Sequence, residues 1–268
     1  MTPHSKRWLT GVVGVPLIFS ILFYGAEELF SLLIVVLILA AVVEYNRLIF
    51  GEGFAWEKVA VLAAAFLVPA AFATGDPQYA LLVISLSIMS AFFFFLLDGR
   101  RKSCDLAPVS KVILGIVYIP LMLSYFILIR RTTNGILWVS FVLVLAFSGD
   151  IAAYYVGKML GRRKLLPFVS PGKTVEGAIG AYLGSVAGSM VFQQLFFPTL
   201  SVIHALALGI AGSTLGQLGD LCESAVKRTA GVKDSGTLLP GHGGLLDRLD
   251  CLIFIIPFVY YYQLFLIG

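Results

Sequence analysis

Five acidic residues stand inside or beside long apolar runs in the C-terminal half of the chain: Asp150, Asp220, Glu223, Asp247 and Asp250. A charged side chain in an apolar span is energetically costly, so it usually faces a polar cavity and marks function. Carboxylate oxygens without a Cys/His cluster favour a hard cation such as Mg²⁺ and argue against structural zinc. The sequence therefore predicts a magnesium site built from these five residues.

Helical spacing places the carboxylates on common faces with other polar side chains. The stripes are Asp150, Tyr154 and Lys158; Asp220, Glu223 or Ser224, and Lys227; and Asp247 with Asp250. The competing interpretation is an intramembrane salt-bridge network with Lys227, Arg228 and Arg248. A single aspartate would favour that network, whereas five carboxylates on matching stripes favour ion coordination.

A first polar loop follows the apolar run that contains Asp150. It includes Ser170, Pro171, Gly172, Lys173 and Thr174 and leads into the next apolar run. Backbone N–H groups, a helix dipole and a lysine ammonium together form a plausible phosphate cradle. The GxxxxGK[ST] spacing of a Walker A loop is absent. A basic loop capped by Thr174 explains the same residues equally well.

A second polar loop runs from Lys233 to Gly244 and has four glycines in its last nine residues. Glycines allow backbone to approach a ligand closely, and so many polar groups exceed what a connector needs. His242 in this loop could act as an acid or orient a phosphate. A turn histidine that bonds a carbonyl is at least as good an interpretation.

At these residues the sequence resembles the phosphatidate cytidylyltransferases, the CDP-diacylglycerol synthases. The matching segments are Ser224-x-x-Lys227-Arg228, Lys233-Asp234, Leu239-Pro240-Gly241-His242-Gly243-Gly244, Asp247-Arg248-x-Asp250, Asp150-x-x-Ala153-Tyr154 and Ser170-Pro171-x-Lys173-Thr174-x-Glu176-Gly177. Three positions depart from the family pattern. Gly149 and Ile151 flank Asp150 where the family commonly has Asn and Thr, and Cys251 stands where Ser is usual. None of these departures removes a carboxylate.

The resemblance implies transfer of CMP from CTP to phosphatidate, giving CDP-diacylglycerol and pyrophosphate. The chemistry of the residues agrees with this reaction. The lipid phosphate is already ionised near neutral pH and needs no strong base, so the difficulty is bringing two anions together. A divalent metal held by aspartates can bridge the phosphates, and basic side chains can neutralise the remaining charge.

On this basis Asp220 and Asp247 are the first expected Mg²⁺ ligands, with Asp250, Glu223 and Asp150 as further ligands or their partners. The expected catalytic residues are Asp220, Asp247, Asp250, Lys227 and Lys233. The expected substrate-binding residues are Ser170, Lys173, Thr174, Ser224, Arg228, Asp234, His242, Arg248 and Tyr154. The expected partners are CTP and phosphatidate in the membrane, with no nucleic acid. A homodimer through Gly180, Gly184 and Gly188 stays open, because such glycines pack helices within one chain just as often.

The elements that position these residues follow from composition. Of the 268 residues 59% are hydrophobic and 13% are charged, and the mean hydropathy is +0.95, which excludes a water-soluble globule. Three cysteines exclude a disulfide framework. We expect an all-α polytopic membrane protein with about nine transmembrane helices, N-terminal spans in 1–134 and catalytic spans in 135–268. The expected spans lie near 8–24, 29–49, 58–74, 79–97, 110–129, 136–156, 175–196, 202–226 and 249–267.

Charge distribution predicts the orientation. Nine spans put only Arg130 and Arg131 on the side opposite the N-terminus and leave the other 17 of the 19 Lys and Arg on the N-terminal side. The positive-inside rule makes that side cytoplasmic, which we expect to be the inner face of a bacterial cytoplasmic membrane. The first apolar run has no small-residue cleavage site after it, so it is expected to be a retained helix.

Other functions remain as alternatives. An ion-coupled transporter also uses intramembrane carboxylates, but it predicts an acidic path across the bilayer, whereas these carboxylates crowd one side. A related CTP-dependent lipid kinase would release CDP instead of pyrophosphate. A CDP-alcohol phosphotransferase lacks support because its DG-containing aspartate motif is missing. A structural scaffold gives no reason for so many charges beside glycine-rich loops.

Overall fold

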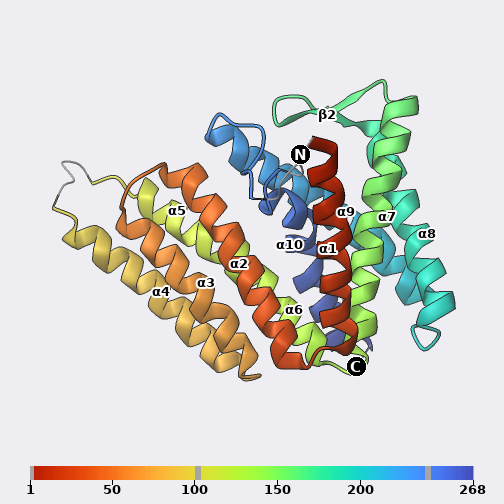
Figure 1. The fold of residues 1–268 in the computed structure, drawn as a ribbon, viewed down its shortest axis with the longest axis horizontal. Helices are drawn as coiled ribbons and strands as arrows, with labels where there is room; N and C mark the ends of the chain where they lie inside the picture. Colours follow the sequence, from red (N-terminus) through yellow and green to blue (C-terminus); the bar gives the residue numbers. More distant parts are fainter. Residues whose placement is uncertain (1–2, 100–103, 239–242, 268) are drawn as a thin grey trace. The chain divides into compact units, whose positions relative to one another are not determined.

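The structure is a computed structural model that describes residues 3–99, 104–238 and 243–267. Most of these residues are helical (Figure 1). The elements are α1 (Pro3–Tyr24), α2 (Glu27–Phe50), α3 (Trp56–Ala73), α4 (Pro77–Leu97), α5 (Ala107–Ile116), η1 (Val117–Leu121), α6 (Met122–Arg131), α7 (Gly135–Leu160), β1 (Lys164–Leu166), β2 (Ser170–Thr174), α8 (Val175–Phe196), α9 (Val202–Thr229), α10 (Leu246–Tyr262) and η2 (Gln263–Ile267).

Within the described residues, eight helical segments are long and apolar enough to cross a membrane, the first of them being α2. Helix α1 covers the first run expected from the sequence. The segment Ala107–Arg131 counts as one span, although it is an α-helix interrupted by the π-helical turn η1 at Pro120. Proline lacks an N–H and its ring crowds the preceding turn, so a local widening accommodates it. The expectation of an all-α polytopic membrane fold with about nine helices is confirmed.

The chain forms two compact units. The first unit comprises Met1–Arg131 with Asp234–Asp247, and the second comprises Thr132–Lys233 with Arg248–Gly268. The division therefore separates the second polar loop from the rest of the C-terminal half and falls in the first turn of α10.

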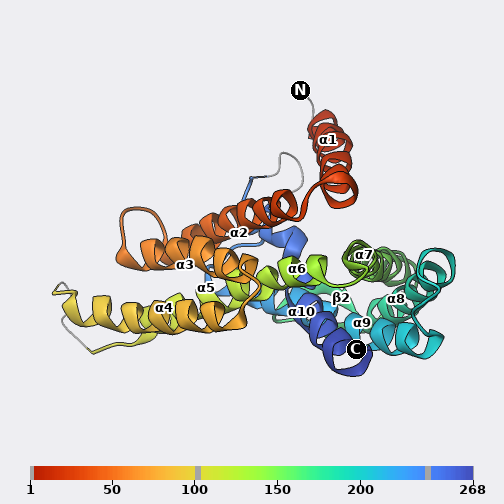
Figure 2. The ribbon, with the colours of Figure 1, turned by 90° about the horizontal axis from the view of Figure 1, so that it is seen from below.

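In the first unit, α2, α3 and α4 lie side by side in both ribbon views (Figures 1 and 2). Tyr45 on α2 is fully buried, and its hydroxyl donates a hydrogen bond of 2.7 Å to the carbonyl of Lys111 on α5.

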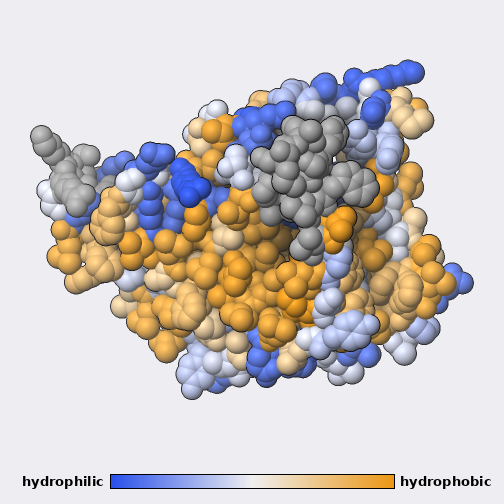
Figure 3. Space-filling model, viewed as in Figure 1, coloured by the Kyte–Doolittle hydropathy of each residue, from blue (hydrophilic) through white to orange (hydrophobic). Residues whose placement is uncertain are grey.

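Outward-facing Leu, Met and Phe side chains cover α4 and give it a hydrophobic surface (Figure 3). That surface suits a helix in contact with lipid.

In the second unit, α7, α8 and α9 pack through small residues. A Cβ atom at Gly180 would lie 2.7 Å from Val156 Cβ, and one at Gly188 would lie 2.8 Å from Ser148 Cβ and still closer to its hydroxyl, so these glycines let α8 approach α7 closely. The glycine stripe thus has a packing role within the chain. The homodimer stays a prediction.

The loop between α7 and α8 contains a short antiparallel hairpin. Strand β1 pairs with β2, with Lys164 opposite Thr174 and Leu166 opposite Ser170. The residues of the first polar loop therefore have a defined backbone, and β2 runs directly into α8.

Candidate active site

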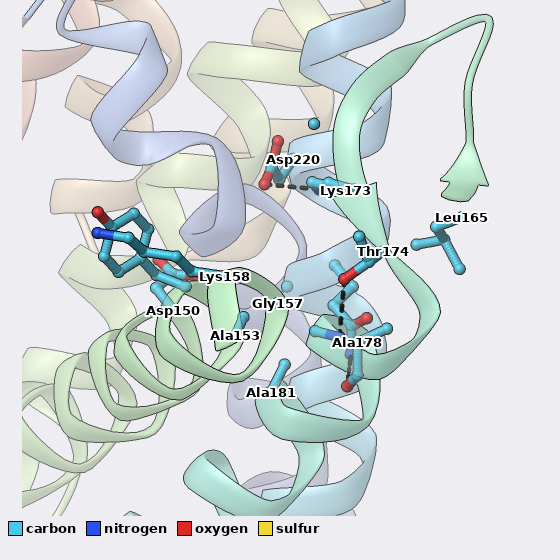
Figure 4. Close-up of a pocket in the computed structure, with 15 residues that line it drawn as sticks. Asp150, Ala153, Gly157, Lys158, Leu165, Lys173, Thr174, Ala178, Ala181 and Asp220 are labelled. Carbon is cyan, nitrogen blue, oxygen red and sulfur yellow. Dashed lines mark hydrogen bonds and ion pairs between the residues drawn. The ribbon is translucent and has the colours of Figure 1, made fainter. Parts of the chain in front are cut away.

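The second unit has a cavity of about 450 Å³ whose lining comes from α7, the hairpin, α8 and α9 (Figure 4). Its lining includes a carboxylate from α7 and one from α9, together with lysines from α7 and β2. These four residues are Asp150, Asp220, Lys158 and Lys173. Sequence segments separated by more than sixty positions thus contribute charged groups to one hollow.

Asp220 and Lys173 form the central ion pair of this cavity. Their Oδ2 and Nζ atoms are 2.6 Å apart, and both side chains are partly exposed (Figure 4). Ser224, one helical turn along α9, donates a longer hydrogen bond of 3.4 Å to the same carboxylate. A partly exposed pair contributes little to stability and can exchange partners, so both groups can act on a charged ligand.

Two further carboxylates stand near Asp220. Asp150 and Asp250 are close enough to interact electrostatically with Asp220 and with each other. The Asp250 carboxylate also accepts the backbone N–H of Cys251 at 2.8 Å. Four of the five predicted metal ligands therefore lie in the second unit, and three of them, Asp150, Asp220 and Asp250, interact with one another.

Glu223 and Lys227 form a buried ion pair one turn apart on α9. The Glu223 side chain is fully buried, and only 11% of the Lys227 side chain is exposed. Lys227 also interacts electrostatically with Asp250. In this arrangement Glu223 neutralises a lysine and does not point into the cavity lining.

Two side chains fix the start of α8, one by capping the helix and one by holding the loop that follows α7. The Thr174 hydroxyl oxygen accepts the N–H of Gly177 at 3.0 Å, and the Glu176 carboxylate accepts the N–H groups of Arg162 and Arg163 at 3.0 and 3.2 Å. Thr174 is therefore the N-cap of α8 and also lines the cavity. The two interpretations of this loop, a capped helix and a phosphate cradle, are compatible.

We expect Thr174→Ala to destabilise the protein by about 1 kcal/mol, because it removes an N-cap. Thermal unfolding in detergent measures this loss. Thr199→Ala, at an exposed turn position, is the matched control and should have little effect. Equal unfolding temperatures for both variants would contradict the capping role.

Other predicted substrate-binding residues have structural partners. Arg228 donates to the carbonyls of Val169 at 3.1 Å and of Val232 at 2.9 Å, so it ties the hairpin to the end of α9. Tyr154 lines the cavity with 60% of its surface exposed, and the Lys158 ammonium lies 5.7 Å from its ring centre. Ser170 begins β2, and the exposed Arg248 interacts with Asp150.

The second polar loop belongs to the first unit from Asp234 onward. There, Asp247 Oδ2 accepts the N–H groups of Ser235 and Gly244, each at 3.0 Å, and lies 3.0 Å from the Ser235 hydroxyl oxygen. Lys233 and Asp234 are exposed. His242 lies outside the described residues.

Sequence reasoning missed Glu44, which lies near the end of α2. Its side chain is buried, with 2% of the residue exposed, and it accepts hydrogen bonds from Ser235, Leu245 and Leu246 of the second polar loop. The signal was available, since a glutamate within a long apolar run is itself unusual.

The chemical type of these carboxylates suits a divalent metal, but their arrangement in this structure does not form a metal site. Asp150, Asp220 and Asp250 offer hard oxygen donors in one region, the set that Mg²⁺ prefers. Over residues 3–99, 104–238 and 243–267, however, no group of three or more His, Cys, Asp or Glu side chains has a geometry that would hold one metal ion. Lys173 neutralises Asp220 in this structure. The magnesium site stays a prediction.

Comparison with known proteins shows the family. A family model described as the cytidylyltransferase family matches residues 5–266. The chain is 31% identical to a phosphatidate cytidylyltransferase of Synechocystis over 295 aligned positions, which cover 98% of this chain and 97% of the relative. It is 44% identical to a phosphatidate cytidylyltransferase of Bacillus subtilis over 154 residues, 57% of each chain. It is also 44% identical to the Escherichia coli protein named uncharacterized protein YnbB over 186 residues, 66% of this chain and 62% of the relative.

The matches to the last two relatives thus span between half and two thirds of those proteins, whereas the family model and the Synechocystis relative extend over nearly the whole chain. On this evidence the chain belongs to the cytidylyltransferase family.

Proposed function

We propose that this protein is a phosphatidate cytidylyltransferase, which transfers CMP from CTP to phosphatidate and forms CDP-diacylglycerol and pyrophosphate. Its membership of the family and the names of the Synechocystis and Bacillus subtilis relatives support this activity. The structural observation that carries the proposal is the cavity in the second unit, where Lys173 pairs with Asp220 beside Asp150. A charged hollow of this kind suits a nucleoside triphosphate.

The residues of the chain provide charge balance and orientation. Lys173 can exchange Asp220 for a phosphate oxygen, because their ion pair is partly exposed. Asp220, Asp150 and Asp250 would hold a divalent cation in this unit, and Asp247 is the corresponding candidate in the first unit. A bound Mg²⁺ would neutralise charge on the phosphates and on the departing pyrophosphate.

We place the protein in a bacterial cytoplasmic membrane with its N-terminus and polar loops on the cytoplasmic side. Two observations support this placement. The Lys and Arg residues gather on the N-terminal side in the nine-span arrangement, and the relatives compared here are bacterial. CTP would then enter from water, while phosphatidate keeps its acyl chains in the bilayer.

The activity can be tested directly with purified protein in detergent, supplied with CTP, phosphatidate and Mg²⁺. We expect CDP-diacylglycerol and pyrophosphate to appear in equal amounts, and both to depend on each substrate. Release of CDP with phosphorylation of a lipid would identify a lipid kinase instead. Ion flux in sealed vesicles without CTP consumption would identify a transporter.

We expect Lys173→Ala to raise the KM for CTP by about tenfold or more, because it removes a cation that pairs with phosphate. Its effect on the unfolding temperature should be small, since the pair with Asp220 is partly exposed. Steady-state kinetics over a range of CTP concentrations measure the change.

Lys111→Ala is the matched control, because Lys111 is an exposed lysine of the first unit. It should leave the KM for CTP unchanged. An unchanged KM for CTP in Lys173→Ala as well would remove Lys173 from the nucleotide site.

A further inference from the structure

Glu44 receives three hydrogen bonds from residues almost two hundred positions away. Its Oε2 accepts the Ser235 hydroxyl at 3.0 Å and the Leu246 N–H at 2.9 Å, while its Oε1 accepts the Leu245 N–H at 3.0 Å. All four residues belong to the first unit and are buried. A carboxylate on α2 thus caps the beginning of α10, where the N–H groups of a helix have no partners of their own.

Two glycines of the second polar loop explain how the chain approaches this carboxylate. A Cβ atom at Gly236 or at Gly244 would lie 2.6 Å from a Glu44 carboxylate oxygen. No side chain fits at such a distance without a shift of the backbone or of Glu44. The glycines are therefore required by the contact with Glu44, independently of any ligand.

Ser235 links Glu44 to Asp247. Its hydroxyl oxygen lies 3.0 Å from Glu44 Oε2 and 3.0 Å from Asp247 Oδ2. Because a hydroxyl has only one proton, it donates to one of these two carboxylates at a time. Asp247 also accepts the N–H groups of Ser235, which itself contacts Glu44, and of Gly244, which precedes Leu245. The loop segments that donate hydrogen bonds to Asp247 are thus the same segments that donate hydrogen bonds to Glu44.

We propose that Glu44 is a positioning residue that fixes the two ends of the second polar loop and so orients Asp247. Glu44 touches neither substrate and acts through the loop. Its importance for catalysis rests on the proposed function, in which Asp247 binds the metal or its phosphates. The hydrogen bonds by which Glu44 fixes the loop do not depend on that function.

Hydrogen exchange of the metal-free protein in detergent tests this hold. In Glu44→Gln one carboxylate oxygen becomes an NH₂ group, so at least one of the Leu245 and Leu246 amides loses its acceptor. We expect exchange in residues 243–247 to accelerate by about tenfold or more, because a buried hydrogen bond to a charged group is lost. Exchange in α3 and α4 should be unchanged.

Glu57→Gln is the matched control, because Glu57 is another buried glutamate of the first unit. It should not accelerate exchange in residues 243–247. Ser235→Ala is a milder second variant, since it removes one donor to Glu44 and leaves the two amide bonds. It should accelerate exchange of the loop less than Glu44→Gln does.

Activity supplies the second measurement. Glu44→Gln should lower kcat and raise the Mg²⁺ concentration for half-maximal rate by about tenfold, with the KM for phosphatidate unchanged. A purely structural role would lower the amount of folded enzyme without moving the Mg²⁺ requirement.

Unchanged exchange in residues 243–247, or equal acceleration in α3 and α4, would overturn the proposal. An unchanged Mg²⁺ requirement in a folded variant would also overturn it. Absence of CMP transfer by the unmodified protein would instead refute the proposed function, and the exchange result would stand by itself.

Discussion

Asp220→Asn is expected to lower the rate of CMP transfer by about 10³-fold while the protein stays folded. The change removes a negative charge from the cavity and leaves a side chain of nearly the same shape. Asp220 is the carboxylate that Lys173 pairs with and that both Asp150 and Asp250 interact with. In the proposed function Asp220 holds the divalent cation that would balance charge in the transition state, and loss of such a ligand has effects of this order. Steady-state kinetics and thermal unfolding in detergent measure the two quantities.

Asp76→Asn is the matched control for Asp220→Asn. The Asp76 carboxylate accepts the N–H of Gln78 at the start of α4, and asparagine caps a helix about as well as aspartate. This variant should therefore keep both rate and stability. A near-normal rate for Asp220→Asn would reject Asp220 as a metal or phosphate contact, and a rate lost together with the fold would show a structural role.

The helices could be predicted from sequence because apolarity and length are local properties. The run expected at 29–49 is α2, Glu27–Phe50, and the short run with Pro69 expected at 58–74 is α3, Trp56–Ala73. Helix ends shift by a few residues because caps and turns, which hydropathy does not register, decide them. The hairpin β1–β2 was expected only as a polar loop. Its pairing of Lys164 with Thr174 joins residues ten positions apart that show no alternating apolar pattern.

The candidate site was predictable in part. Matching stripes and an expected common side of the membrane predict that Asp150, Asp220 and Asp250 gather, and in the structure these three carboxylates are close enough to interact. Spacing along one helix cannot show which distant groups a side chain meets. Arg228 therefore looked like a phosphate ligand and is found bonded to two backbone carbonyls. Glu44 was missed for the same reason, because these partners lie just over two hundred positions away.

The buried pair on α9 carries the largest expected effect on stability. Glu223→Gln should lower the free energy of unfolding by about 3–5 kcal/mol, because it leaves the ammonium of Lys227, a side chain that is only 11% exposed, without the carboxylate one turn away. Lys227→Met should cost a similar amount, since it leaves a fully buried carboxylate without its lysine. Denaturant or thermal unfolding in detergent measures both losses.

A double variant decides whether charge pairing is the cause. Glu223→Gln combined with Lys227→Met removes both charges and should recover most of the lost stability, because neutral side chains replace a buried ion pair at little cost. Glu27→Gln, at the half-exposed pair of Glu27 and Arg131 with atoms 3.7 Å apart, is the matched control and should cost less than about 1 kcal/mol. Additive losses in the double variant would mean that each side chain is held by separate contacts. A recovered fold without CMP transfer would instead separate the stabilising role of the pair from a direct role of Lys227 beside Asp250.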